Sequence, residues 1–188
     1  MIAMDKLTIL RISNNDLETT NSKDSINDSL GALPLSLQQL DIASNHYKEL
    51  PKSILVLTNL IELNLNSNRI ATIIGIGNLI NLIDLFLDDN MITELPEEVS
   101  QLTKVKKISI KRNKITNISS INSSEQSIPS NLFTSTGILN IDLEGNPINK
   151  SDIMKFNGVE SFLERRKSLK NKALLGGGLN DNSLFGLD

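Results

Sequence analysis

A nine-residue pattern of apolar residues and asparagine recurs six times along the chain. Apolar side chains occupy its first, fourth and sixth positions, and its ninth position is Asn in every copy. The copies begin at Leu7, Leu37, Leu60, Leu82, Val105 and Ile138. The four starts from Leu37 to Val105 are 23, 22 and 23 residues apart. A fixed period of this length predicts a solenoid, in which each repeat packs only on its neighbours.

The spacing within each copy indicates a short strand with one buried face. Apolar residues at the fourth and sixth positions alternate as strand side chains do. The ninth position follows the strand, where an Asn amide can bond backbone groups of neighbouring coils. We therefore predict a structural column made of Asn15, Asn45, Asn68, Asn90, Asn113 and Asn146.

A second set of apolar residues follows the strands and returns the chain to the next copy. Its members are Leu50 and Pro51 with Ile54 and Leu57, Ile73 with Ile76 and Leu79, and Leu95 and Pro96 with Val99 and Leu102. These spacings suit helical or 3-10 turns. The predicted fold class is an α/β solenoid of about six coils, a leucine-rich-repeat horseshoe. Its concave face is a parallel β-sheet, and its convex side carries helical, 3-10 or irregular segments.

Two polar insertions and a helical ending complete the predicted organisation. The leucine-rich-repeat domain spans residues 1–150, with insertions near 18–32 and 119–131. The insertions are interpreted as flexible padding, or alternatively as modifiable or partner-binding loops. The second is expected to rejoin the core through Ile128, Leu132 and Phe133.

A C-terminal capping helix region is predicted over 151–175 and a Gly-hinged tail over 176–188. Ser151 or Asp152 is the candidate N-cap of the helix. An apolar stripe should cover the last coil through Val159, Phe162, Leu163, Leu169 and Ala173. The basic residues of the same helix form a solvated face, or alternatively contact an anionic membrane or an acidic partner: Arg165, Arg166, Lys167, Lys170 and Lys172. In the tail, Leu184, Phe185 and Leu187 are either exposed or docked on the convex side.

The N-terminal end of the solenoid has no comparable cap, because the first copy begins only about seven residues from Met1. Three interpretations stay open: a frayed first coil, an insertion folded back as a lid, or pairing of the open strand edge with another chain. The last would give a homodimer, whereas a monomer is the principal expectation.

Composition narrows the location and the class of partner. The chain has no Cys, which excludes disulfides and Cys-based zinc sites. It shows no apolar run of signal-peptide length and none long enough to span a membrane. A cytoplasmic protein is therefore predicted, with the nucleus left open. The net charge of −3 gives no basic field, so nucleic acid is not a predicted partner.

Candidate chemistry is sparse, so neither an enzyme nor a cofactor is predicted. The single His46 follows an asparagine of the column and has no second metal ligand beside it in sequence. Gly75 and Gly77 lack the rest of a phosphate-binding loop and are interpreted as turn glycines. Asp88, Asp142 and Glu144 are a conceivable divalent-cation set. We predict no metal site, because the strands separate these carboxylates and Lys111 stands between them.

The outward-facing residues of the concave strands are the candidate partner-binding residues. They occupy the third, fifth, seventh and eighth positions of the last three copies: Asp84, Phe86, Asp88, Asp89, Lys107, Ser109, Lys111, Arg112, Asp142 and Glu144. Phe86 is the only aromatic residue expected to point outward, and aromatic residues ringed by polar groups are typical of interface hot spots. Alternatively, the acids of the fourth copy and the bases of the fifth satisfy one another in cross-strand ion pairs.

The repeat and its Leu-Pro variants resemble cytosolic leucine-rich-repeat proteins of the plant intracellular Ras-group-related kind. The last third, with IPSNLFTSTGILNIDLEGNPI and KFNGVESFLERRKSLKNKAL, resembles the family of leucine-rich repeat-containing protein 57. The chain departs from that family in its fewer repeats, missing N-terminal cap and Asn-rich insertion. The resemblance implies no catalytic role and no cofactor. The predicted function is a non-catalytic adaptor or regulatory scaffold that binds a protein on its concave face. The alternative is a structural subunit of a larger assembly or an edge-paired homodimer.

Overall fold

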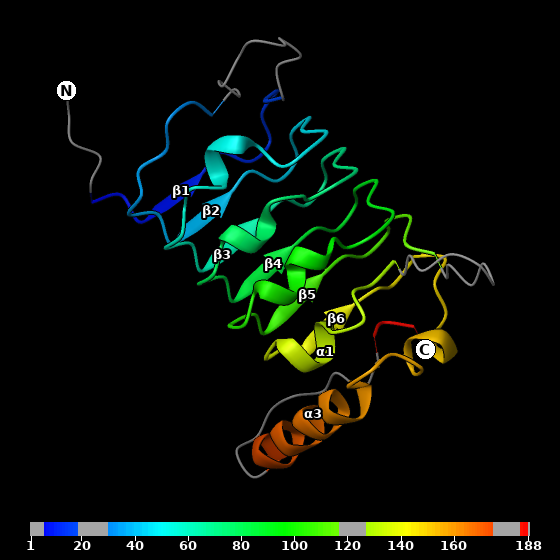
Figure 1. Cartoon of the computed structure of the whole chain (residues 1–188). Helices are drawn as coiled ribbons and strands as arrows, with labels where there is room; N and C mark the ends of the chain where they lie inside the picture. The colour runs from blue at the N-terminus through cyan, green and yellow to red at the C-terminus, as the bar shows by residue number, and fades with distance from the viewer. Residues whose placement is uncertain (1–5, 19–29, 117–126, 175–184, 188) are drawn as a thin grey trace.

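Six short strands form one parallel sheet in the computed structural model, which describes residues 6–18, 30–116, 127–174 and 185–187 (Figure 1). The strands are β1 (Ile9–Arg11), β2 (Gln39–Asp41), β3 (Glu62–Asn64), β4 (Asp84–Phe86), β5 (Lys107–Ser109) and β6 (Asn140–Asp142). They lie in sequence order, and each occupies the third to fifth positions of one copy of the repeat. Residues 19–29 of the first insertion, 119–126 of the second, and 176–184 and 188 of the tail lie outside the described residues.

The register places equivalent positions of the repeats side by side. Leu40 is paired with Leu63, Leu63 with Leu85, and Leu85 with Ile108. Because side chains alternate along a strand, this register buries the fourth-position column from Leu40 to Ile141 and presents the third and fifth positions on the opposite face.

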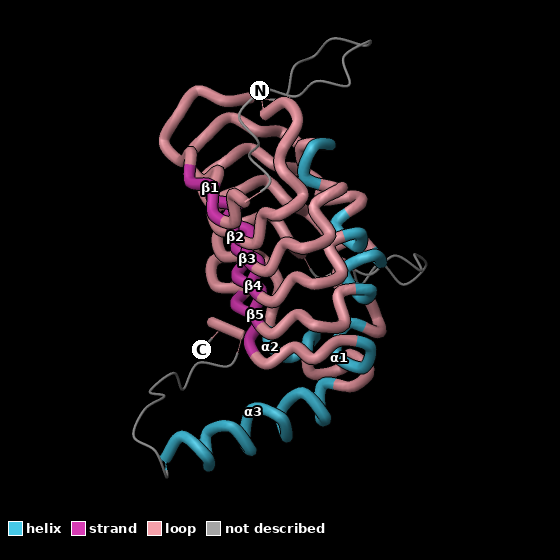
Figure 2. Tube along the Cα trace, turned by 90° about the vertical axis from the view of Figure 1, so that its left-hand side faces the viewer, coloured by secondary structure: helices cyan, strands magenta, loops and turns pink. Residues whose placement is uncertain are grey.

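Helical turns cover the side of the solenoid opposite the sheet, as Figure 2 shows. They are η1 (Lys52–Ile54), η2 (Ile76–Asn78), η3 (Glu97–Gln101) and α1 (Leu132–Ser135). Each turn sends apolar residues inward, because Ile54, Ile76, Val99 and Leu132 are fully buried. The structure thus confirms the predicted leucine-rich-repeat architecture, with 3-10 turns as the dominant convex element in the described repeats.

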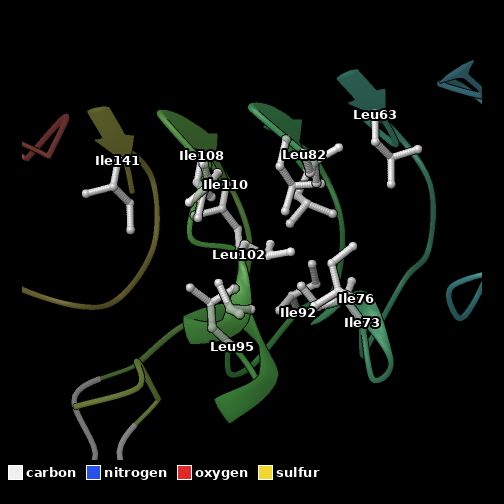
Figure 3. Packing of buried hydrophobic residues seen from close by; sticks show 14 of the residues in the cluster. Leu63, Ile73, Ile76, Leu82, Ile92, Leu95, Leu102, Ile108, Ile110 and Ile141 are labelled. Carbon is white, nitrogen blue, oxygen red and sulfur yellow. The ribbon is translucent and has the colours of Figure 1, made fainter. Parts of the chain in front are cut away.

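The core lies between the sheet and these turns and is almost entirely aliphatic. Figure 3 shows Leu63, Leu82, Ile108, Ile110 and Ile141 beneath the strands, facing side chains that come from the return segments. The facing residues include Ile73, Ile76, Ile92, Leu95 and Leu102. The second insertion rejoins this core as expected, since Ile128, Leu132 and Phe133 have no exposed surface.

The predicted asparagine column is confirmed as a structural ladder. The Asn90 side chain donates to the carbonyls of Leu65 and Leu87 at 3.0 and 3.1 Å, and accepts from the Ile70 N–H at 2.9 Å. Asn68 and Asn113 repeat this arrangement one coil earlier and one coil later. Each of these side chains therefore joins its own turn to the preceding coil and satisfies backbone groups that burial would otherwise leave unpaired.

The C-terminal cap differs from the predicted single helix. It consists of α2 (Lys150–Ile153) and α3 (Val159–Leu174), separated by a turn in which Gly158 has φ +80°. The N-cap prediction of Ser151 or Asp152 was wrong, because Asn149 accepts from the Asp152 N–H at 3.0 Å. Asn is as good an N-cap as Ser or Asp, so residue type alone did not decide between neighbouring positions.

Helix α3 lies beyond the last coil and covers it (Figure 1). Val159 and Phe162 are buried, and Leu163 packs against the core. Leu169 is exposed, so its predicted place in the apolar stripe was wrong. Arg165, one of the basic residues of α3, donates to the Phe133 carbonyl at 3.0 Å and so joins the capping helix to α1. The side chains of Lys170, Lys172 and Ala173 lie outside the described residues. None of the helices in the described ranges is both long and apolar enough to cross a membrane.

Candidate protein-binding face

The fifth-position residue Phe86 lies near the centre of the concave face, on β4. It is half-buried, and the Lys107 ammonium on β5 lies 4.9 Å from the centroid of its ring. A cation at this distance is attracted by the ring face. Lys107 is in register with Asp84, yet Asp84 takes part in none of the salt bridges formed by the described residues. The predicted Asp84–Lys107 ion pair was therefore wrong.

Asp88 bonds the backbone of the next coil instead of a basic side chain. Its Oδ1 accepts from the Ser109 hydroxyl at 2.7 Å and from the Lys111 N–H at 2.8 Å. Ser109 itself is only 5% exposed, because its hydroxyl lies under this carboxylate. The expected pairing of Asp88 with the Lys111 ammonium is thus wrong, and both Asp88 and Ser109 hold β4 and β5 together.

Lys111 reaches forward to the sixth coil. Its Nζ lies 2.8 Å from Asp142 Oδ2 and 2.9 Å from Glu144 Oε2. The hydrogen bond to Asp142, followed by the one to Glu144, raises the pKa of Lys111, so this ammonium is charged at physiological pH. The two carboxylates thereby converge on the Lys111 ammonium. The described residues contain no group of His, Cys, Asp and Glu side chains able to hold a metal ion.

Arg112 and Asp89 form the one predicted pair between the fourth and fifth coils. The Arg112 Nε and Nη2 atoms donate to the two carboxylate oxygens at 2.6 and 2.7 Å. This fork geometry is the strongest form of the arginine–carboxylate pair. The hydrogen bond from Arg112 lowers the pKa of Asp89. Both side chains are about half exposed, so the pair lies at the rim of the face.

Two further residues extend the set that sequence reasoning identified. Glu62 on β3 is in register with Asp84, so two carboxylates stand on adjacent strands beside Phe86. The repeat pattern predicts that Glu62 faces outward, but no basic residue on its own strand indicated that it belongs to the site. The second addition is the tail: the Leu143 N–H donates to the Phe185 carbonyl at 2.7 Å, next to Asp142. Nothing in the repeat pattern signalled that contact.

His46 does not belong to this face. Its Nε2 atom lies 3.3 Å from an oxygen of Asp16, and the Asp16 side chain is fully exposed. The pair lies in the turns that follow β1 and β2, away from Phe86. The structure therefore places the only histidine of the chain at a surface turn.

These features define a leucine-rich-repeat fold with a charged, aromatic-centred concave sheet. Neither a protein-family model nor a curated protein sequence matches the chain. Many solved structures with the same fold do, and two of them serve as examples. An internalin from Listeria monocytogenes matches 66% of this chain with a TM-score of 0.53 and 18% identity. The leucine-rich-repeat ectodomain of the Arabidopsis thaliana receptor kinase GASSHO1/SCHENGEN3, solved in complex with CASPARIAN STRIP INTEGRITY FACTOR 2, matches 82% with a TM-score of 0.56 and 23% identity.

The chain spans only a part of these neighbours. It covers 34% of the internalin chain and 18% of the receptor ectodomain. At such identities the similarity shows the fold and the stacking of the coils, and leaves the surface residues to be considered by themselves.

Proposed function

We propose that this chain is a non-catalytic protein-binding module, an intracellular adaptor or regulatory scaffold that holds a protein partner against its concave sheet. The observation that carries the proposal is Phe86, a half-buried aromatic residue on the solvent side of a rigid sheet. Solenoids present extended concave surfaces of this kind to their partners. The resemblance to plant intracellular Ras-group-related proteins supports the same proposal.

The ion pairs of the face divide its residues into two groups. Asp89, Arg112, Lys111, Asp142 and Glu144 satisfy one another, so they form a rim that shapes the surface. The Arg112–Asp89 pair is about half exposed, and exposed pairs of this kind contribute at most about 1 kcal/mol.

The second group surrounds Phe86 and is available to a ligand. Glu62, Asp84 and Lys107 lie on three adjacent strands, and none of them forms a salt bridge within the described part of the chain. An aromatic anchor bordered by unpaired charges of both signs suits a partner with an apolar side chain flanked by polar groups.

The test compares two double variants in affinity purification from the native cell. Phe86→Ala with Lys107→Glu removes the anchor and reverses the charge beside it. Val56→Ala with Lys52→Glu makes the same change of charge on the convex side, where both side chains are exposed. We expect the first variant to lose a protein that the second retains, with at least a tenfold loss of affinity when that protein is purified. Equal recovery with both variants would contradict the proposal.

A second candidate function rests on the N-terminal end of the solenoid. Strand β1 is the edge of the described sheet, and Ile9 on it is 42% exposed. Beneath it a cavity of about 240 Å³ is lined by Leu10, Ile12, Asn15, Leu17, Leu30 and Leu33. An open edge over apolar residues favours a structural subunit or an edge-paired homodimer. Light scattering separates the candidates: a dimer that Ile9→Lys converts to a monomer supports the second, and a monomer at all concentrations supports the first.

A further inference from the structure

The end of the chain, Phe185–Leu187, occupies the position that a seventh coil would take beside β6. In each coil the N–H of the sixth position donates to the carbonyl of the fifth position in the following coil. Leu65 donates to Phe86, Leu87 to Ser109 and Ile110 to Asp142, at 2.7 to 2.9 Å. The next member of this series is Leu143, and its N–H donates to the Phe185 carbonyl at 2.7 Å.

The Phe185 side chain packs against two aromatic rings. Its centroid lies 5.4 Å from that of Phe162 on α3, in a stacked arrangement, and 6.2 Å from that of Phe133 on α1. The two receiving rings themselves are 5.2 Å apart. All three rings are fully buried. Phe185 thus completes an aromatic cluster with Phe133 of α1 and Phe162 of α3, although its segment forms only one backbone bond to the sheet edge.

Two left-handed residues form the docked turn, and its backbone favours Gly at the second position. Phe185 has φ +63°, which turns its ring toward the core although true fifth-position residues point outward. Gly186 has φ +69°, and a Cβ atom there would collide with Asp142 Oδ1 and lie 3.0 Å from Glu144 Cβ. Asp142 has little freedom to withdraw, because Lys111 holds its other oxygen. A side chain at position 186 therefore obstructs the docked conformation.

We propose that the β6 edge, together with Phe133 and Phe162, is an exchangeable peptide-binding site for a Phe-Gly turn, and that the chain's own segment Phe185–Leu187 fills it in cis. The recognition combines one backbone hydrogen bond, from the Leu143 N–H at the sheet edge to the Phe185 carbonyl, with a pocket for one aromatic side chain. This site lies at the end of the solenoid and is separate from the surface around Phe86.

The first test measures docking of the tail in the full chain. Hydrogen exchange of the Leu143 amide reports its bond to Phe185, and exchange of the Leu87 amide reports whether the central coils remain folded. We expect Phe185→Ala and Gly186→Val each to accelerate exchange of Leu143 at least tenfold and to leave Leu87 unchanged. Unchanged exchange at Leu143 would overturn the proposal. Faster exchange at Leu87 in both variants would overturn it too, since the tail would then be inseparable from the core.

The second test measures exchange of the tail for a peptide in trans. The probe is a fluorescein-labelled peptide with the sequence of residues 180–188, added to the full chain carrying Phe185→Ala. Fluorescence anisotropy should show binding, at least tenfold weaker binding to the unmodified chain because the tethered tail competes, and at least tenfold weaker binding of the same peptide with Ala for Phe. The peptide should also restore protection of Leu143. If it binds neither chain, the tail is a fixed part of the fold and the proposal fails.

A second copy of the chain is the remaining source of the same segment. Light scattering of the unmodified chain distinguishes it. A dimer that Phe185→Ala dissociates would show that the site is filled by exchange between two chains, and would overturn occupation in cis.

Discussion

Five asparagine side chains are buried in the turns that follow the strands: Asn45, Asn68, Asn90, Asn113 and Asn146. A buried amide is tolerated only when its donors and acceptor are satisfied, and each of these meets backbone groups of two coils. Asn15 in the first copy is exposed, and it bonds only the Ile12 and Ser13 carbonyls of its own turn. Asn15 in the first copy and Asn90 in the fourth thus compare the same residue without and with a preceding coil among the described residues.

Substitution of the central asparagine should destabilise the chain far more than substitution of the first. Asn90→Ala leaves the Ile70 N–H without its partner, at about 1–3 kcal/mol for a buried unsatisfied group. It also removes one of the two side-chain bonds to the Leu65 carbonyl, which keeps the bond from Asn68. We expect a loss of about 2–4 kcal/mol in the free energy of unfolding. Asn15→Ala should lose less than about 1 kcal/mol. Urea denaturation followed by circular dichroism measures both, and equal losses would contradict the role of the ladder.

The residue pattern predicted the ladder but not the partners of the charged side chains. The Asn column has one position in every copy, and the turn allows it one orientation. Lys111 has acids on both sides, since neighbouring strands are about 4.8 Å apart and its long side chain reaches either one. It takes Asp142 and Glu144 because Asp88 is already bonded to Ser109 and to the Lys111 backbone. That competition is a property of the assembled sheet.

The turn between α2 and α3 sets the direction in which the capping helix leaves the last coil. Gly158 lies there with a left-handed backbone, and a Cβ atom at this position would collide with the Thr134 methyl group and lie 3.1 Å from the Thr134 nitrogen. The backbone of the turn therefore approaches α1 as closely as a residue without a side chain permits.

Gly158→Ala should loosen this cap, and the chain offers a matched control. Gly31 also has a left-handed backbone, with φ +61°, but has open space where a Cβ would lie. Gly31→Ala should therefore cost only the left-handed penalty of roughly 1–2 kcal/mol. Gly158→Ala adds the collision, and we expect about 1–3 kcal/mol beyond the control. Thermal unfolding measures the difference, and equal effects would show that α1 moves freely away from the turn.

The positions of elements that belong to the repeat were predictable. The boundaries of elements that occur once were not. Six strands coincide with six copies of one pattern, so each copy supports the assignment of the others. The C-terminal cap occurs once. Its apolar stripe indicated a helix, but the break at Gly158 depends on contact with α1. The N-cap depends on which of the polar residues Asn149, Ser151 and Asp152 precedes the first turn.

Burial across the whole molecule is uneven from one end of the sheet to the other. Leu85 and Ile108 in the central strands are fully buried, whereas Leu10 of β1 is only partly buried. In a solenoid each coil is stabilised by its neighbours, so an end coil has one stabilising interface and a central coil has two. Local opening should therefore begin at β1.

Hydrogen exchange should reveal this gradient. The Ile12 amide, bonded to the Asp41 carbonyl at 2.8 Å, and the Leu87 amide, bonded to Ser109 at 2.7 Å, occupy the same repeat position. We expect Leu87 to exchange at least 100-fold more slowly, because its opening requires disruption of central coils. Similar protection of the two amides would indicate that another chain covers the first coil, which light scattering would detect.

The candidate site was predictable as a face and not as a set of contacts. Alternation along the strands gave Phe86 and its neighbours as outward residues, and the structure places Phe86 on the sheet surface. The docking of Phe185 was not predictable, because it brings together residues from α1, α3 and the end of the chain that share no repeat position. Contacts between unrelated positions require the assembled molecule.

The asparagine ladder gives the solenoid a direction. A backbone N–H in the turn of each coil donates to an asparagine side chain of the coil that follows. Tyr47 donates to Asn68, Ile70 to Asn90 and Ile92 to Asn113. The ribosome synthesises the chain from its N-terminus, so every turn emerges before the asparagine that accepts its N–H. The last turn of the nascent solenoid therefore lacks its asparagine acceptor. Each new coil supplies that acceptor to the preceding turn, while its own turn still lacks one.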